Sequence, residues 1–207
     1  MKTIEHKFIN DLIELEQNKI FAGRSIIGNN RLLVVGTFNP SENIISKPNN
    51  AEWFYGRKAN NLWKYIPEVI NKKTLKESDK AEWVKFCYHN KMVIIDLIKS
   101  FKATEKLKSF SDKELEHKIN IKGSQPIFFD SNKAFIESTF DFVIFTRKTW
   151  GNDIRSLHSA KKNLIDQLLA AKTIQNENQI ILCPAPWGNF KNRAKEWEAK
   201  LQLIKNK

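Results

Sequence analysis

The sequence predicts an α/β protein, a three-layer α/β/α sandwich around a central, mainly parallel four-stranded sheet. Four short apolar runs have the length and composition of buried strands, at residues 32–35, 92–95, 142–145 and 180–182. Segments with helical spacing of apolar residues separate these runs, an alternation typical of a sheet that is covered by helices on both faces. The 207 residues, 41% of them apolar, suffice for one ordinary core.

The helical segments can be placed in order along the chain. At the N-terminus we expect an amphipathic helix within residues 1–22, because apolar residues recur at helical spacing before Gly23. These residues are Ile4, Phe8, Ile9, Leu12 and Leu15. The same spacing predicts four more helices. They cover residues 61–70 after the first strand, 80–88 before the second, 154–171 after the third and 194–204 after the fourth.

One stretch does not follow this pattern. Residues 101–141 are rich in Lys, Ser and Glu, have only scattered apolar residues and carry no recognisable motif. We interpret them as an insertion or as a long excursion over the sheet edge, with the charged residues on a solvated helix face. No repeat, low-complexity tract or Pro- and Gly-rich linker divides the chain, which predicts a single domain over residues 1–207.

The charge balance favours a polyanionic partner. Lys and Arg number 35 against 23 Asp and Glu, which gives a formal net charge of +12, and 14 Phe, 6 Trp and 3 Tyr accompany this charge. Neutralising phosphates and stacking on bases need both kinds of residue, so DNA is the expected partner. The alternative is a basic surface that only serves solvation.

Several classes of site lack their residues in this sequence. Cys87 and Cys183 lie far apart and form no CxxC pair, which predicts reduced cysteines and no zinc or iron–sulfur site. No GxGxxG or GxxxxGK[ST] motif supports a nucleotide cofactor, and we expect no cofactor. No apolar run approaches the roughly 20 residues of a membrane span. We therefore expect a cytoplasmic protein without membrane contact, and a monomer.

The first predicted strand leads into residues with candidate chemistry. It runs into the turn Gly-Thr-Phe-Asn-Pro at 36–40, and a cluster of aromatic and amide residues follows at 53–63. Parallel sheets place their ligands at the carboxyl ends of the strands. We therefore expect the backbone amides of Thr37 and Phe38 and the side-chain amide of Asn39 at a binding site on this edge.

These residues resemble the uracil-DNA glycosylase superfamily. The turn at 36–40, followed by Phe-Tyr-Gly-Arg-Lys-Ala-Asn-Asn-Leu-Trp at 54–63, is similar to the mismatch-specific and hypoxanthine-type branches, whose spacing Asn60 matches. The segment Cys-Pro-Ala-Pro-Trp-Gly-Asn at 183–189 is similar to the family's loop that inserts into DNA beside a flipped base. The resemblance covers about residues 31–190 and implies the family's α/β fold.

The resemblance implies a monofunctional DNA glycosylase of base excision repair. Such an enzyme flips a nucleotide out of DNA and hydrolyses the N-glycosidic bond of a deaminated base, uracil or hypoxanthine. Positioned amides suffice for this reaction, because charge develops on the departing base. The candidate catalytic residues are Asn60, Asn39 and Asn189. The candidate substrate-binding residues are Gly36, Thr37, Phe38, Phe54, Tyr55, Arg57, Lys58, Pro184, Ala185, Pro186, Trp187 and Gly188.

The sequence also departs from the family pattern. Arg57 and Lys58 stand where related branches often have His-Pro, and Asn39 lies one residue later than the activating residue of the familiar first motif. No histidine occurs in any of the motifs. These departures favour the alternative function, a glycosylase-like protein that binds nucleic acid without turnover.

Several candidates also have a structural interpretation. Asn39 stands before a proline and can form a turn, and Asn60 can cap the helix that follows it. We expect Trp63 in the core, while one of the two aromatic residues at 54–55 faces the pocket. Asp96, at the end of the second strand, is expected to form a hydrogen bond with the following turn.

Overall fold

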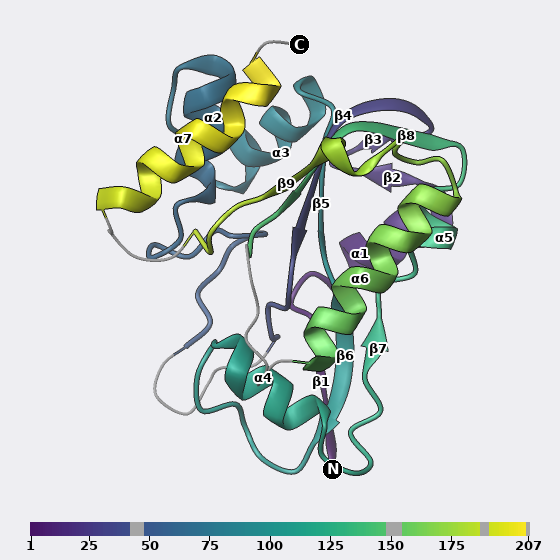
Figure 1. Ribbon diagram of the computed structural model, residues 1–207. Coiled ribbons are helices and arrows are strands. Elements are labelled where there is room, and N and C mark those ends of the chain that lie inside the picture. Colours follow the sequence, from purple (N-terminus) through teal and green to yellow (C-terminus); the bar gives the residue numbers. More distant parts are fainter. Residues whose placement is uncertain (42–47, 148–154, 187–190, 206–207) are drawn as a thin grey trace.

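The centre of the molecule is a four-stranded parallel sheet. The structure is a computed structural model that describes residues 1–41, 48–147, 155–186 and 191–205. The strand order in the sheet is β5-β4-β8-β9 (Figure 1). The strands are β4 (Gly28–Gly36), β5 (Met92–Asp96), β8 (Ser138–Phe145) and β9 (Ile180–Leu182). Each contains one of the four predicted apolar runs, so the predicted strands and their parallel arrangement are confirmed.

The register of this sheet brings the strand ends to one level. Val35 of β4 lies opposite Ile95 of β5 and Phe145 of β8, and Phe145 lies opposite Leu182 of β9. The apolar runs of β4 and β5 are at most 2% exposed, as expected for strands covered on both faces. The carboxyl ends of all four strands therefore form one edge; a loop follows β4, β8 and β9, while only Leu97 separates β5 from the next strand, β6 (Ile98–Ala103).

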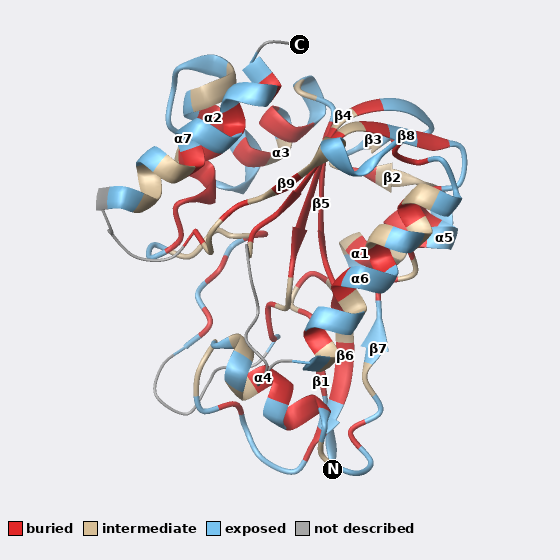
Figure 2. Ribbon diagram, in the orientation of Figure 1, coloured by how far each residue is buried: buried red, intermediate tan, exposed pale blue. Residues whose placement is uncertain are grey.

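Two layers of helices enclose the sheet (Figure 1). Helices α2, α3 and α7 cover one face, and α1, α5 and α6 cover the other (Figure 1). Figure 2 shows buried strands between helices that each have buried and exposed residues. The bounds are α1 (Ile9–Asn18), α2 (Leu62–Asn71), α3 (Lys80–His89), α5 (Ser131–Ala134), α6 (Arg155–Ala170) and α7 (Lys191–Lys205), with a short 3-10 helix, η1 (Glu177–Gln179), before β9. The predicted three-layer sandwich is confirmed, and each of the four helices predicted after the first strand has its counterpart.

The N-terminal segment differs from the prediction. Residues Lys2–Glu5 form a strand, β1, and the helix α1 begins only at Ile9; the hairpin of β2 (Ile20–Phe21) and β3 (Arg24–Ser25) follows it. Strand β1 pairs antiparallel with β6 (Ile98–Ala103), where Ile4 lies opposite Phe101. The predicted helix over 1–22 is therefore wrong at both ends. Ile4 lies four residues before Phe8, which is helical spacing. Its strand partner, Phe101, lies far along the chain, and local periodicity cannot predict such a pairing.

Residues 101–141 form regular structure that packs on the rest of the chain. After β6, helix α4 (Asp112–Ile119) and strand β7 (Ile127–Phe128) follow, and β7 completes an antiparallel sheet of order β1-β6-β7. The buried Glu116 carboxylate of α4 accepts hydrogen bonds from the backbone N–H groups of Ser156 and Leu157, at 2.6 and 3.0 Å. A carboxylate at a helix N-terminus is favourable, so this contact ties α4 to α6. Lys118, expected on a solvated face, is instead buried and pairs with Glu105 at 3.3 Å.

Three stacked tryptophans hold the loop that precedes α2. The Trp63 ring stacks on both Trp53 and Trp83, with ring centroids 6.0 and 5.3 Å apart, and its Nε1–H donates to the Phe54 carbonyl at 2.7 Å. Trp63 is 1% exposed and lies in the core, as expected. Gly56 lies so close to the Trp83 ring that a Cβ atom would overlap it. The backbone on both sides of this loop is thus fixed by core packing.

The described residues contain neither a helix that is long and apolar enough to cross a membrane nor a cluster of His, Cys, Asp or Glu that could hold a metal ion. Both cysteines are buried and have free thiols. Burial raises the pKa of the Cys183 thiol to about 12, so this group is protonated at neutral pH and offers no thiolate nucleophile.

Candidate active site

A cavity of about 580 Å³ opens at the carboxyl edge of the central sheet. Its walls come from the loops after β4, β8 and β9, from the end of β5, from the loop before α2 and from the segment before α4. The lining residues are Thr37, Phe38, Asn39, Tyr55, Arg57, Asn60, Asp96, Ser109, Phe110, Ser111, Asp112, Thr146, Arg147, Ala185, Pro186 and Arg193. This is the edge at which α/β folds bind their ligands.

Gly36 ends β4 directly before the lining residue Thr37 and lies against two side chains that line the cavity, those of Asp96 and Tyr55. A Cβ atom at this position would overlap both the Asp96 Oδ1 atom and the Tyr55 hydroxyl oxygen. The absence of a side chain therefore allows a carboxylate and a phenol to lie side by side over the end of β4. No other residue type fits here without displacing one of these two groups.

The Asp96 carboxylate is held by a histidine from the N-terminal segment. His6 Nε2 and Asp96 Oδ2 are 2.7 Å apart, and His6 Nδ1 accepts a hydrogen bond from the Phe8 backbone N–H at 3.0 Å. Because Nδ1 is an acceptor, the ring proton is on Nε2 and is donated to Asp96. His6 is 1% exposed, and its ring stacks on Phe54 at 5.4 Å. Within the described part of the chain, nothing donates a hydrogen bond to the second oxygen, Asp96 Oδ1.

Tyr55 enters the cavity from an unusual backbone conformation. Its φ angle is +59°, in the left-handed region that bulky residues seldom adopt. The Thr146 hydroxyl donates to the Val35 carbonyl at 3.1 Å, so the Tyr55 hydroxyl donates to Thr146 Oγ1 at 2.9 Å. Burial raises the pKa of Tyr55 well above its usual range, and the phenol stays protonated. Such strain at a cavity wall is typical of a functional site.

Asn39 and Arg57 fix each other on one wall. The Asn39 Oδ1 atom accepts hydrogen bonds from Asn49 Nδ2 at 2.8 Å and from Arg57 Nη2 at 2.6 Å. Both partners are donors, so the oxygen is correctly placed and the Nδ2 amide group remains as a donor. The Arg57 guanidinium carbon lies 3.7 Å from the centre of the Phe110 ring. Arg57 has no carboxylate partner within ion-pair distance among the described residues.

Asn60 has a structural role and also faces the cavity. Its Oδ1 atom accepts a hydrogen bond at 2.9 Å from the backbone N–H of Leu62, the first residue of α2, whereas the N-cap position is Asn61. No described residue accepts a hydrogen bond from its Nδ2 group. The next residue, Asn61, donates its backbone N–H to the Pro186 carbonyl at 2.7 Å. This bond ties the loop after β9 to the start of α2 and brings the separate sequence motifs together.

Four of the described candidate residues do not line the cavity: Gly36, Phe54, Lys58 and Pro184. Thr37, Phe38, Ala185 and Pro186 line it. Phe54 is 0% exposed and packs in the core against His6, so it is Tyr55 that faces the cavity. Lys58 is exposed outside the cavity, and the Pro184 carbonyl accepts the Trp197 Nε1–H at 2.9 Å. Asn189, Trp187 and Gly188 lie outside the described residues.

Sequence reasoning missed several residues of the site. Thr146 and Arg147 directly follow a predicted strand, so the rule that placed Asn39 at the sheet edge could have found them. Phe110 comes from residues 101–141, which carry no motif, and His6 comes from a segment predicted as helix. Arg147 pairs with Asp112 at 2.5 Å and thereby joins the loop after β8 to α4. Asp96 was expected to form a hydrogen bond with the turn that follows it, but its partner is His6, which lies 90 positions earlier in the sequence.

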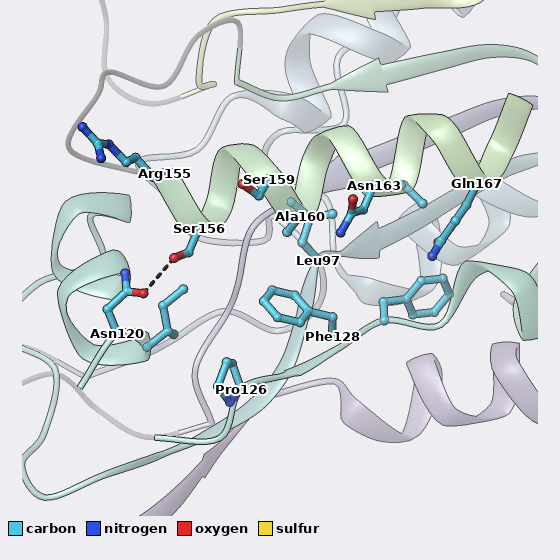
Figure 3. Close-up of a pocket in the computed structure, with 13 residues that line it drawn as sticks. Leu97, Asn120, Pro126, Phe128, Arg155, Ser156, Ser159, Ala160, Asn163 and Gln167 are labelled. Carbon is cyan, nitrogen blue, oxygen red and sulfur yellow. Dashed lines mark hydrogen bonds between the residues drawn. The ribbon is translucent and has the colours of Figure 1, made fainter. Parts of the chain in front are cut away.

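A second cavity, of about 430 Å³, lies between α6 and β7 (Figure 3). Asn163 and Gln167 of α6 and Phe128 of β7 face it (Figure 3). The Ser156 hydroxyl donates to Asn120 Oδ1 at 2.7 Å on its rim. No acidic residue lines this cavity, and none of the motif residues reaches it. We therefore place the candidate active site at the strand edge.

Comparisons with known proteins give one distant likeness. No family model matches the chain, and no curated protein matches it. A solution NMR structure from Methanosarcina acetivorans, named a "putative Uracil DNA glycosylase", is 17% identical in sequence. The alignment covers 86% of this chain and 91% of that chain, with a TM-score of 0.45. A likeness this distant carries no function from one protein to the other.

Proposed function

We propose that this protein is a monofunctional DNA glycosylase that removes a deaminated base, uracil or hypoxanthine, from DNA. One observation carries the proposal: a cavity at the strand edge presents three donor groups and one acceptor that bind no other described residue. The donors belong to Asn39, Asn60 and Arg57, and the acceptor is Asp96 Oδ1. A cavity of about 580 Å³ lies in the range of small-ligand sites and accommodates one flipped nucleotide.

The chemistry of base removal suits this set of groups. The bond between C1′ and the base nitrogen breaks with its electron pair on the base, and the oxygen of water bonds to C1′. The departing base gains a negative charge and finally takes up a proton from the attacking water. Fixed amide donors and a guanidinium stabilise this developing charge without covalent help from the protein. The Oδ1 atom of Asn60 accepts a hydrogen bond from the Leu62 N–H, which fixes the direction of its Nδ2 group, and Asn60 is our first candidate for the catalytic residue.

Two further properties support this reaction with DNA. None of the described residues that line the cavity is a lysine, so none of them supplies an amine for a Schiff base with the sugar. Hydrolysis by water is therefore favoured over a bifunctional lyase reaction. The net charge of +12 attracts the DNA backbone and helps an extruded nucleotide reach the strand edge.

A glycosylase-like binding protein without turnover is the second candidate. The observation that favours it is the state of Asn39, whose Oδ1 atom already accepts two hydrogen bonds and is not available to orient a water molecule. In this case the cavity would hold a flipped base without cleaving its bond.

Excision from labelled oligonucleotides separates the two functions. Single- and double-stranded substrates carry uracil, hypoxanthine or xanthine, and abasic sites are cleaved after incubation. We expect the unmodified protein to release a base. The variant Asn60→Asp keeps an oxygen that can accept from the Leu62 N–H but loses the amide donor, and we expect it to release the base at least about 100-fold more slowly. The control Asn71→Ala changes an exposed asparagine at the other end of α2 and should match the unmodified protein.

Two results would contradict this assignment. Salt-sensitive DNA binding without release of any base would support the binding protein instead. Full excision by Asn60→Asp would remove Asn60 from the catalytic site and leave the glycosylase function standing.

A further inference from the structure

The Arg57 guanidinium is a charged group that the strand-edge cavity holds without an ion pair. Across the described part of the chain, no carboxylate lies within ion-pair distance of it. Its Nη2 group donates to Asn39 Oδ1 at 2.6 Å, and its central carbon lies 3.7 Å from the centre of the Phe110 ring. A carbon at this distance is in van der Waals contact with the ring, so the guanidinium lies over the ring face.

The hydrogen bond and the ring act on different parts of the guanidinium. The hydrogen bond uses an N–H group in the guanidinium plane, whereas the Phe110 ring covers one of the two faces. A single hydrogen bond would let the plane turn about the line from Nη2 to Asn39 Oδ1. A ring packed on the face opposes this turn, so the two contacts together fix the direction of the remaining N–H groups.

The Phe110 ring is itself anchored by the residues that follow it. Asp112 pairs with Arg147, directly after β8, at 2.5 Å. The hydroxyl of Ser111, the N-cap residue of α4, accepts a hydrogen bond from the Glu114 backbone N–H at 3.2 Å. Phe110 is half-buried and packs against the core. A ring on an anchored segment can hold a neighbouring side chain in place.

The ring face also suits a cation that has left water. Burial lowers the pKa of Arg57 to about 10, because it disfavours the charged form. The electron-rich face of an aromatic ring attracts a cation, and this attraction is stronger where water is excluded. The Phe110 ring therefore opposes the effect of burial on the Arg57 charge.

We propose that Phe110 is a positioning residue for base excision, which holds the Arg57 guanidinium where it stabilises the charge on the departing base. The inference rests on the proposed function, since it takes the group that Arg57 acts on to be a departing base. It gives residues 101–141, which carry no motif, a part in the reaction.

A double-mutant cycle on excision separates positioning of Arg57 from support of the fold. Phe110→Leu replaces the ring with an apolar side chain, and Phe110→Tyr keeps the ring face. At pH 7 we expect Phe110→Leu to slow excision at least about fivefold and Phe110→Tyr to stay within about twofold of the unmodified protein. In a protein that already carries Arg57→Gln, Phe110→Leu should cause no further loss.

Phe128→Leu is the matched control for this cycle. It makes the same change at an exposed phenylalanine of residues 101–141 that does not line the strand-edge cavity, and it should leave excision unchanged. An equal loss from Phe110→Leu with and without Arg57 would overturn the proposal, because the ring would then act through the fold or directly on the ligand. Full excision by Phe110→Leu would overturn it as well.

NMR spectroscopy tests the contact without any need for catalysis. In protein with isotope-labelled arginine, the Nε–H signal of Arg57 should be displaced by the ring current of Phe110, and its absence from the Arg57→Gln spectrum identifies it. We expect this signal to move in Phe110→Leu and to stay in place in Phe128→Leu. A signal that stays in place in both variants would show that the ring does not hold Arg57.

Failure of this inference and failure of the proposed function give different results. Excision that does not depend on Phe110 keeps the glycosylase and removes the positioning role. If the protein binds uracil-containing DNA and releases no base, the proposed function fails. The same cycle, measured on the affinity for that DNA, then decides whether Phe110 positions Arg57.

Discussion

The cavity at the strand edge and the cavity along α6 differ in how their polar groups are held. At the strand edge, Asp96, Asn39 and Asn60 each have one side-chain atom bound to the protein and another that binds no described residue. Along α6, Ser159 and Asn163 are exposed residues that project from one helix. The first arrangement holds these groups in a fixed geometry before a ligand arrives. In the second, Ser156 and Gln167 form hydrogen bonds with Asn120 and Ser131, but no described residue holds the side chains of Ser159 and Asn163 in this way. Three predictions test whether this difference decides function.

The largest effect is expected from Gly36→Ala. The added methyl group must displace the Asp96 carboxylate or the Tyr55 hydroxyl, because both lie where the Cβ atom would be. We expect base excision to fall by more than about 100-fold and the free energy of unfolding to fall by about 2 kcal/mol from overpacking. Excision assays and urea unfolding measure the two quantities.

Gly23→Ala serves as the control for Gly36→Ala. Gly23 has a φ angle of +72° and no atom within 4 Å of a Cβ position, so its substitution strains the backbone without touching the cavity. We expect a loss of about 1 kcal/mol in stability and unchanged excision. If Gly36→Ala excises the base as fast as Gly23→Ala does, the close packing of Asp96 and Tyr55 over Gly36 does not position the reacting groups.

An intermediate effect is expected from raising the pH. Burial lowers the pKa of Arg57 to about 10, below the ordinary value of its guanidinium, since burial disfavours the charged form. The charge is therefore present at neutral pH and is lost as the pH rises through about 10. We expect excision to decline over this range, while Tyr55 stays protonated because its pKa is raised well above the usual range.

Arg57→Gln identifies the group behind this decline. The variant should show lower excision at pH 7 and a flat profile up to pH 10.5, once denaturation has been excluded by thermal melting at each pH. If the variant declines with the same midpoint as the unmodified protein, another group is responsible and Arg57 does not act through its charge.

The smallest effect is expected in the second cavity. Asn163→Ala removes an exposed amide from α6 and should change the free energy of unfolding by no more than about 0.5 kcal/mol. Excision should stay within about twofold of the unmodified protein. A loss of tenfold or more would show that a loosely held cavity also contributes to the reaction, and the contrast between the two cavities would then not decide function.

Local patterns predicted the central fold and the place of the site. Four apolar runs became the four parallel strands because strands covered on both faces are continuously apolar, and this placed Thr37, Asn39 and Ala185 at one edge. The asparagine before a helical pattern was expected to cap the helix; the N-cap is Asn61, one residue later, and the Asn60 side chain instead accepts a hydrogen bond from the Leu62 N–H. These features depend on neighbours in sequence, so the sequence displays them directly.

Other features depend on contacts between distant segments. The strand β1 exists because Ile4 pairs with β6, although its spacing to Phe8 is helical. Phe110 reaches Arg57 because α4 is tied to α6 and to Arg147, contacts that no local pattern signals. Phe54 and Tyr55 are equally aromatic, and only the fold decides which of them is buried.

Because of the contact between His6 and Asp96, the geometry of the site depends on the pairing of β1 with β6 as well as on the parallel sheet. The two residues are separated by 90 positions in the chain, and the histidine directly follows β1, which must pair with β6 for this contact to form. Local opening of β1 would free the carboxylate to rotate while the parallel sheet stayed intact. Ligand binding at the strand-edge cavity should then be lost before the parallel sheet unfolds, so hydrogen exchange at β1 and loss of binding should report the same opening event.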